Sequence, residues 1–253
     1  MKFMKKKANS GAHSASERDF ILNDNTSFAI DEAYNTLRSN IVFSMVDKGC
    51  KVVEFTSCKM SDGKSINILN TAITFAETNA KVLLIDCDLR RPNINRLLNR
   101  REYPGLTNVL VGATTVENAI ETIDEYKLDV LLSGNLPPNP SELLSSKAFE
   151  ELLMELREKY DYIFIDTPPV SAVIDAALVS KVVNGTVIVV RPGVCKKDEI
   201  VSVVNQLEFA GAKIVGFILN GVEFERRSKY SRKTDGYGYG YGYAEAKKAT
   251  KAK

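Results

Sequence analysis

A glycine, a lysine and a hydroxyl residue follow one another at Gly63-Lys64-Ser65, where an apolar stretch gives way to a helical pattern. Such a triplet can bind phosphate, because backbone N–H groups at a helix start attract anions, a lysine adds positive charge and the hydroxyl can ligate Mg²⁺. The full phosphate-loop pattern, G-x-x-x-x-G-K-[ST], would have a glycine where Cys58 stands. The triplet alone therefore leaves two interpretations open, a nucleotide site or a surface helix that happens to begin with lysine.

Acidic side chains stand at the ends of two apolar runs. Asp86 and Asp88 end one run and Asp166 ends the other. Residues two apart on a strand share a face, so Asp86 and Asp88 can point together into one cleft. Acids that merely terminate a strand would explain a single carboxylate more easily than a pair followed by Arg90 and Arg91.

The elements that position these residues alternate along the chain. Continuous apolar runs, typical of strands buried on both faces, lie at 52–56, 81–86, 128–132, 162–165, 186–190 and 214–219. Helical patterns lie at 27–46, 64–79, 141–160, 172–183 and 197–210. This alternation predicts an α/β fold with a doubly wound, mostly parallel sheet, in which ligands gather at the carboxyl ends of strands. The three acids, Arg191, Asn220 and the phosphate loop all fall at those ends, which favours the nucleotide interpretation.

Composition and charge narrow the class of protein. The 253 residues are 44% hydrophobic with a formal net charge of +2, which fits one large globular domain and does not point to a nucleic acid partner. The four cysteines are scattered without C-x-x-C spacing, so we expect neither disulfides nor a zinc site, and a reducing cytoplasm fits best. No apolar run approaches the roughly 20 residues of a membrane span, and the start lacks a signal peptide's apolar core.

The two ends of the chain differ from its middle. Residues 1–27 are polar and are expected to be a flexible segment, whereas residues 28–225 carry the alternating elements. Residues 226–253 form a basic tail with glycine alternating with tyrosine, which disfavours helix and strand and predicts disorder with accessible phenol groups. The basic ends are either solvated tails or contacts for an anionic membrane surface or polymer.

Taken together and in this order, the motifs resemble those of a known family. The stretch Val82–Arg90 is similar to that family's second acidic motif, and Ile163–Pro169 is similar to its Walker B motif with paired prolines. The stretch Pro137–Leu144 is similar to its proline loop, and the terminal tyrosine cluster to its autophosphorylation tail. The family is that of the bacterial tyrosine kinases (BY-kinases) of capsule and exopolysaccharide synthesis, in the form whose kinase chain is separate from a membrane activator. The likeness covers about residues 28–243.

The resemblance implies a P-loop NTPase fold of the MinD/ParA-like type over 28–225 and an ATP- and Mg²⁺-dependent tyrosine autokinase. It implies that nucleotide is bound by Ser61, Asp62, Gly63, Lys64, Ser65, Ile66, Arg191 and Asn220. The implied metal ligands are Ser65, Asp88 and Asp166, and the implied catalytic residues are Lys64, Asp86, Asp88 and Asp166. Asp86 is the candidate for accepting the tyrosine proton. The implied autophosphorylation sites are Tyr230, Tyr237, Tyr239, Tyr241 and Tyr243.

The resemblance also implies partners. A transmembrane activator would recruit this cytoplasmic chain to the inner face of the cell membrane, and the chain would form a homo-oligomer through the region of Glu32 and Arg38. The family's motif there is Glu-x-x-Arg-x-x-Arg, and this chain has Asn35 in place of the first arginine, which predicts a weaker assembly. Its loop usually reads Pro-Gly-Glu-Gly-Lys, where this chain has Met60 and Ser61. A serine in place of glycine predicts strain if the position has a positive φ, and a change in nucleotide affinity.

Two rival functions share the same sheet, loop and acids. One is a positioning or partitioning ATPase switch, which transfers phosphate to water and has no need of the tyrosine tail. Lys59 stands where such ATPases carry a lysine that reaches across a dimer, but the two glycines that follow it in their loop are missing. The other rival is a regulatory module with weakened nucleotide binding, for which Met60 and Ser61 are the motive. Calorimetric measurement of Mg²⁺-ATP binding would separate this second rival from both enzymes.

Overall fold

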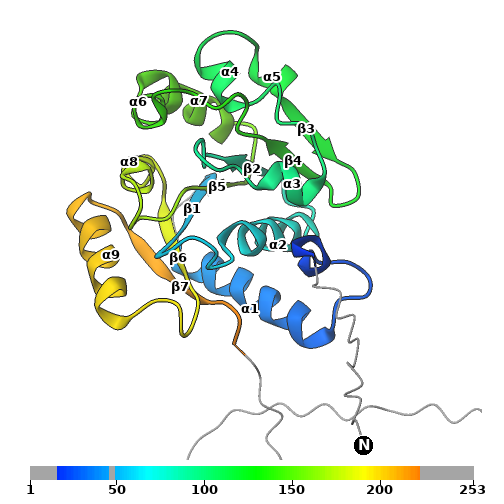
Figure 1. Ribbon diagram of the computed structural model, residues 1–253. Coiled ribbons are helices and arrows are strands. Elements are labelled where there is room, and N and C mark those ends of the chain that lie inside the picture. The colour runs from blue at the N-terminus through cyan, green and yellow to red at the C-terminus, as the bar shows by residue number, and fades with distance from the viewer. Residues whose placement is uncertain (1–15, 46–48, 223–253) are drawn as a thin grey trace, which may run out of the picture. The chain divides into compact units, whose positions relative to one another are not determined.

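The structure, a computed structural model, describes residues 16–45 and 49–222 (Figure 1). The chain divides into two units, Met1–Val222 and Glu223–Lys253, and the second lies wholly outside the described residues. The strands of the described part are β1 Lys51–Ser57, β2 Val82–Asp86, β3 Ile120–Ile123, β4 Leu128–Leu131, β5 Tyr162–Asp166, β6 Gly185–Val190 and β7 Ile214–Leu219. They form one sheet in the order β3-β4-β2-β5-β1-β6-β7. All neighbours are parallel except β3 and β4, so the predicted mostly parallel sheet is confirmed.

Helices cover both faces of this sheet (Figure 1). The helices are η1 Glu17–Phe20, α1 Phe28–Ser44, α2 Lys64–Ala76, α3 Ile94–Leu98, α4 Leu106–Leu110, α5 Val116–Ala119, α6 Pro140–Leu144, α7 Lys147–Arg157, α8 Asp175–Val179 and α9 Lys197–Phe209. Within the part of the chain that the structure describes, no helix combines the length and the apolar character that crossing a bilayer requires.

Side chains on the two faces of the sheet belong to separate cores. On one face α1 and α2 pack with β1, β2 and β5 around Phe55, Phe75 and Phe164, whose rings meet edge to face. On the other face α7, α8 and α9 pack against the alternate residues of the same strands. Because successive side chains of a strand point to opposite faces, central strands that are buried on both must be apolar throughout, as the sequence pattern predicted.

The helix predicted over 141–160 is wrong in one respect, because the structure has two helices there. α6 ends at Leu144, and Ser146 then begins α7 with its hydroxyl accepting a hydrogen bond from the backbone N–H of Phe149. A serine in this position satisfies one of the free N–H groups of a new helix start. The apolar spacing continues across the break, and it therefore concealed the interruption.

Two further elements differ from the prediction. The helix expected over 172–183 is only the short α8, and the antiparallel edge strand β3 was not predicted. β3 has only one buried residue of its four, Ile123, so it lacks the apolar run by which the other strands are recognised. A strand at the edge of a sheet is half solvated and has a weaker sequence signal than a central one.

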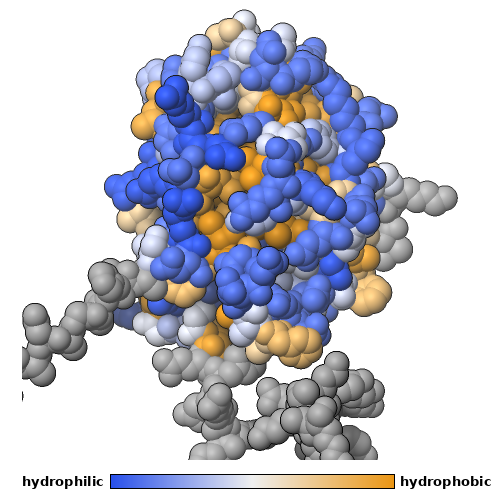
Figure 2. All heavy atoms as spheres, turned by 90° about the vertical axis from the view of Figure 1, so that its right-hand side faces the viewer, coloured by the Kyte–Doolittle hydropathy of each residue, from blue (hydrophilic) through white to orange (hydrophobic). Residues whose placement is uncertain are grey.

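The amino-terminal segment was predicted to be flexible over 1–27, but its described part, from Ser16, packs on the domain. Ile21 and Leu22 are buried in the core beneath α1 and α2. The side chain of Asn70 on α2 accepts a hydrogen bond from the backbone N–H of Leu22 at 3.0 Å and donates one to the carbonyl of Phe20 at 2.9 Å. Figure 2 looks onto this side of the molecule, where polar residues cover most of the surface and apolar atoms show between them.

Candidate active site

The loop between β1 and α2 has the backbone conformation of a phosphate loop. Gly63, which precedes the first helical residue, has a φ of 86°, and a Cβ there would lie 2.0 Å from the side-chain nitrogen of Asn220. Only glycine fits this position. Asn220 follows β7 and donates from Nδ2 to the carbonyl of Asp62 at 2.8 Å, so it braces the loop from the far side. Asn220 therefore lies beside the loop, with its side-chain nitrogen bound to the backbone of Asp62.

Ser61 has a φ of 66°, in the left-handed region that glycine enters without cost. For a residue with a Cβ this conformation costs about 1 kcal/mol. The expected strain at this departure from the family's loop is thus present in the backbone.

Asp62 turns its carboxylate into the loop. It is 1% exposed, and its Oδ2 accepts hydrogen bonds from the backbone N–H of Lys59 at 2.8 Å and from the thiol of Cys195 at 3.3 Å. Its backbone remains part of the loop, whereas its side chain stabilises the turn.

Lys64, Ser65 and Asp166 meet at the carboxyl ends of β1 and β5. The ammonium nitrogen of Lys64 lies 2.5 Å from Oδ1 of Asp166, and the Ser65 hydroxyl donates to Oδ2 of the same carboxylate at 2.7 Å. Lys64 also lies 3.9 Å from Oδ2 of Asp88. Both Lys64 and Asp166 are buried, at 7% and 0% exposed side chain. The structure therefore brings together the lysine, the hydroxyl and two of the three acids that the sequence predicted.

Asp86 lies beside Asp166, because β2 and β5 pair in parallel with these two residues in register. Its Oδ1 accepts from the backbone N–H of Asp88 at 3.1 Å and its Oδ2 from that of Ile94 at 3.3 Å. Burial raises the pKa of Asp86 well above its usual range, and the charge of Asp166 raises it further, while Lys64 opposes the shift. A buried carboxyl with a raised pKa is able to hold a proton near neutral pH.

The charges of this cluster shift one another's protonation. Burial also raises the pKa of Asp88, where the positive charge of Lys64 opposes the shift and the negative charge of Asp166 adds to it. Burial lowers the pKa of Lys64, but Asp166 and Asp88 more than compensate, so its pKa is raised and it stays an ammonium ion. The site thus gathers several carboxyl groups around one buried positive charge, which is the arrangement expected where anionic phosphate and a divalent cation bind together.

The donor atoms suit Mg²⁺, which prefers hard oxygen ligands and usually binds through one or two carboxylates, waters and phosphate oxygens. The Ser65 hydroxyl and the carboxylates of Asp166 and Asp88 supply such oxygens. Among residues 16–45 and 49–222, no three His, Cys, Asp or Glu side chains are grouped to hold a metal ion by themselves. The oxygen set fits Mg²⁺ only as a partial ligand shell that phosphate would complete.

Two further residues that were predicted to bind nucleotide, Arg191 and Ile66, differ in their exposure to solvent. Arg191 follows β6 directly and is exposed. Its side chain passes close to Gly221, where an added Cβ would lie 3.3 Å from its Nε. Ile66 packs its side chain against the core between α1 and α2, so only its backbone in the first turn of α2 faces the loop. The predicted tyrosines, Tyr230 and those at 237–243, lie outside the described residues.

Lys59 folds back onto its own chain. Its ammonium group lies 2.7 Å from Oε1 of Glu199 at the start of α9 and 3.3 Å from the carbonyl oxygen of Val194. In the described structure this lysine therefore links the phosphate loop to α9.

Sequence reasoning missed two groups beside the site. One is an ion pair between Arg90 and the fully buried Asp175, at 2.7 Å, to which the hydroxyl of Ser141 also donates at 2.6 Å. The other is Glu54 in the middle of β1, buried between the hydroxyls of Thr167 and Thr186. A lone acid in an otherwise apolar run was the available signal for Glu54.

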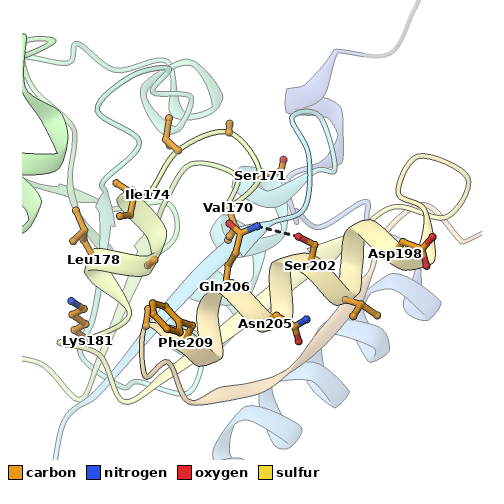
Figure 3. Close-up of a pocket in the computed structure, with 15 residues that line it drawn as sticks. Val170, Ser171, Ile174, Leu178, Lys181, Asp198, Ser202, Asn205, Gln206 and Phe209 are labelled. Carbon is orange, nitrogen blue, oxygen red and sulfur yellow. Dashed lines mark hydrogen bonds between the residues drawn. The ribbon is translucent and has the colours of Figure 1, made fainter.

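A separate hollow of about 970 Å³ lies between α8 and α9 (Figure 3). Apolar side chains such as Ile174, Leu178 and Phe209 line it, together with Gln206, which donates to Ser202 at 3.2 Å. None of the predicted nucleotide or metal residues lines this hollow. Its size therefore does not mark the site of the chemistry.

Comparison with known proteins agrees with the site geometry. The model of an AAA domain matches residues 50–212. The chain is 41% identical to the tyrosine-protein kinase YwqD of Bacillus subtilis over 199 residues, covering 79% of this chain and 84% of that one. It is 35% identical to the putative tyrosine-protein kinase CapB of Staphylococcus aureus over 209 residues, covering 83% and 92%. The chain belongs to the BY-kinase family.

Solved structures give the same result. The chimerical protein CapA2B2 superposes with a TM-score of 0.71 at 37% identity, over 74% of this chain and 83% of that one. The septum site-determining protein MinD from Pyrococcus horikoshii, complexed with Mg-ADP, superposes with a TM-score of 0.58 at 26% identity, over 67% and 70%. The P-loop fold of the MinD type and the protein-tyrosine kinase activity of capsule and exopolysaccharide systems, both predicted from the sequence, are thus confirmed for this BY-kinase chain.

Proposed function

We propose that the chain transfers the γ-phosphoryl group of Mg²⁺-bound ATP to tyrosines of its own carboxyl-terminal tail. The observation that carries this proposal is the meeting of Lys64, Ser65 and Asp166 at the end of the phosphate loop, with Asp88 within reach of the same ammonium group. This places a positive charge, a metal-binding hydroxyl and metal-binding carboxylates around one point, as phosphoryl transfer requires.

The chain's own groups would bind and orient the triphosphate. The N–H groups of the first turn of α2 have no partner within the helix, and such free N–H groups at a helix start favour an anion. Lys64 would exchange its contact with Asp166 for one with the β- and γ-phosphates, and Ser65 would exchange its bond to the same carboxylate for the metal. Asp166 would then be free to act as a metal ligand with Asp88. The bound Mg²⁺ supplies charge neutralisation on the phosphates.

The tyrosine oxygen attacks the γ-phosphorus, the bond to the β-phosphate oxygen breaks and ADP leaves. The phenol proton must go to a base, because a free phenol has a pKa near 10. Asp86 is our candidate, since burial and Asp166 raise its pKa toward the range in which a carboxylate accepts a proton. Its backbone hydrogen bonds to Asp88 and Ile94 fix its orientation beside Asp166.

The acceptors are Tyr230, Tyr237, Tyr239, Tyr241 and Tyr243. The last described residue, Val222, follows β7, which lies next to β6 in the sheet. The carboxyl ends of these parallel strands, including that of β7 before Val222, lie at the same edge of the sheet as Asp166.

A membrane protein is the proposed activator, and it would bring the chain to the inner face of the membrane. The similarity to a chimerical protein named CapA2B2, which joins two components in one chain, supports a kinase that works with a second component. A homo-oligomer through the region of Glu32 and Arg38 is also proposed, as a weak one. The Arg38 guanidinium donates to the carbonyl of Thr74 on α2 of its own chain at 2.9 Å, and such a bond competes with a contact to a neighbour.

Mass spectrometry of the purified chain, incubated with ATP and Mg²⁺ with or without a membrane fraction, tests the proposal. Phosphotyrosine within 230–243 is the expected result, and its loss in a Lys64→Met variant ties it to the site. Release of inorganic phosphate without phosphotyrosine would favour an ATPase switch. Failure to bind Mg²⁺-ATP in calorimetry would instead favour a regulatory module.

A further inference from the structure

Glu54 is a buried acid that the proposed reaction does not use. It lies in the middle of β1, at 0% exposure, and faces the side of the sheet opposite to Lys64 and Asp86. Its Oε1 is 2.9 Å from the hydroxyl of Thr167, directly after Asp166, and its Oε2 is 2.9 Å from the hydroxyl of Thr186 on β6. One side chain thus links β1 to β6 and to the residue that follows β5, the two strands on either side of β1.

The hydrogen bonds around Glu54 can be formed by either protonation state of its carboxyl group. The Thr167 hydroxyl has one hydrogen but lies within reach of two acceptors, Oε1 of Glu54 and the carbonyl of Phe55 at 3.1 Å. A protonated Glu54 can donate to the Thr167 oxygen, so that the Thr167 hydrogen goes to Phe55 while Thr186 donates to Oε2. An ionised Glu54 would instead accept from both threonine hydroxyls, and the carbonyl of Phe55 would still accept from the backbone N–H of Thr167. What favours the neutral acid is that this fully buried carboxyl has uncharged hydroxyls as its hydrogen-bond partners.

The surroundings favour the protonated form. Burial raises the pKa of Glu54 to about 8, against the opposing effects of the two threonine hydrogen bonds and the charge of Lys64. The charged and titratable groups on β1 and on the elements packed against it are Lys51 on β1, Tyr162 and Asp166 on β5, Lys64 on α2 and Asp175 on α8, with Cys87 after β2. Asp175 is already paired with Arg90. The neutral acid therefore adds no further negative charge behind a site that must bind a triphosphate.

The network is connected to the reacting groups through Thr167. The backbone N–H of Thr167 donates to the carbonyl of Phe55 at 3.0 Å, and Phe55 is in register with Asp166. We propose that Glu54, as an un-ionised carboxylic acid, is a positioning residue that fixes the end of β5 and thereby the carboxylate of Asp166 against Lys64 and Ser65. This inference rests on the proposed function for its kinetic consequence, but the protonation state of Glu54 is independent of it.

Two variants of Glu54 separate positioning from simple packing. Glu54→Gln keeps the hydrogen-bond pattern of the neutral acid, because its N–H can donate to Thr167 and its oxygen can accept from Thr186. Glu54→Leu fills similar space without either bond. At about pH 7 we expect the glutamine variant to keep the wild-type kcat within about twofold, and the leucine variant to lose about tenfold with a smaller change in KM for ATP. Equal turnover of the two variants would overturn the positioning role.

Thermal unfolding without nucleotide tests the protonation state. The folded chain retains a proton on Glu54 that the unfolded chain releases above its ordinary pKa of about 4.3. The stability of the wild type should therefore fall with rising pH until the folded-state pKa of about 8 is passed. Glu54→Gln has no proton to lose at this position, so its stability lacks this fall with pH. The difference in Tm, variant minus wild type, should therefore increase between about pH 6 and about pH 9. Parallel Tm profiles would show that Glu54 is not the neutral acid proposed here.

Two isosteric threonine variants serve as matched controls. Thr167→Val and Thr186→Val each remove one hydroxyl from Glu54, but only Thr167 adjoins Asp166. We expect both to lower Tm and only Thr167→Val to lower kcat, whereas an equal loss of turnover would mean general destabilisation and no positioning. If the wild type shows no kinase activity, the Kd for Mg²⁺-ATP replaces kcat in the same comparison. Failure of the proposed function is thereby distinguished from failure of the network.

Discussion

The two faces of the central sheet hold buried acids in opposite ways. On the α2 face Asp166 lies against the ammonium group of Lys64, and Asp86 and Asp88 are close enough for their charges to interact with it. On the other face, Glu54 has two threonine hydroxyls as its hydrogen-bond partners among the described residues. Asp166 has an ionic partner in Lys64, as Asp175 has in Arg90, whereas Glu54 is bound by uncharged hydroxyls and in our inference retains a proton.

Lys64→Met should have the largest effect of the variants that test this comparison. We expect tail phosphorylation to fall by about two to three orders of magnitude, because the charge that serves the phosphates is lost. Stability should also fall by about 3 kcal/mol, since removal of one partner of a buried pair leaves the other uncompensated. Chemical denaturation and phosphotyrosine mass spectrometry measure the two effects.

The double variant Lys64→Met with Asp166→Asn is its control. Removal of both charges should restore much of the stability without restoring phosphorylation. A double variant no more stable than the single one would mean that the pair is not an isolated ionic contact.

Asp86→Asn and Glu54→Gln compare the two buried acids by their effects on kcat. Asp86 and Glu54 both have raised pKa values, but only Asp86 adjoins Asp166 in the register of the strands. We expect Asp86→Asn to lower kcat by about 10²-fold, as loss of a general base does, whereas Glu54→Gln should not. Normal turnover of Asp86→Asn with Mg²⁺ would show that this acid has only a structural role.

The local signals in the sequence were sufficient for the central part of this site. Apolar runs ending in acids predicted the strands, and the parallel order that follows from strand-helix alternation predicted that Lys64, Asp86, Asp88 and Asp166 converge. The residues next to each of these four in the sequence were enough to predict its position. The positive φ of Ser61 was expected for another reason, because the related loops have a glycine at this position.

The other face could not be derived in this way. The partners of Glu54 lie 113 and 132 residues away, directly after β5 and on β6, so nothing local indicates whether the acid is paired, protonated or part of a site. The docking of Leu22 onto Asn70 across 48 residues was hidden for the same reason. The break at Ser146 has a local cause, because this serine caps the start of α7. The apolar spacing continues across it, however, and this spacing predicted one uninterrupted helix.

Removal of the ion pair between Arg90 and Asp175 should have a smaller effect. This pair and Ser141 join the segment after β2 to α6 and α8, and the Arg90 side chain is 38% exposed, against 7% for Lys64. Arg90→Ala leaves the buried Asp175 with the Ser141 hydroxyl, and we expect a loss of about 2 kcal/mol in the free energy of unfolding. Denaturant titration measures it, and Arg90→Ala with Asp175→Ala should recover part of the loss. If Arg90→Ala is as stable as wild type, the carboxylate of Asp175 has another partner.

Ser61→Gly should have the smallest effect and the opposite sign. The φ of 66° costs a serine about 1 kcal/mol that glycine does not incur, partly offset by the greater freedom of glycine in the unfolded chain. The net rise in stability should therefore be a fraction of that amount, and the Kd for Mg²⁺-ATP should fall because backbone strain is removed where phosphate binds.

Lys127→Gly is the matched control, since Lys127 has a φ of 52° at the exposed turn between β3 and β4. It should raise Tm to a similar extent and leave the Kd unchanged. If both substitutions change the Kd equally, backbone strain in the phosphate loop does not control nucleotide affinity.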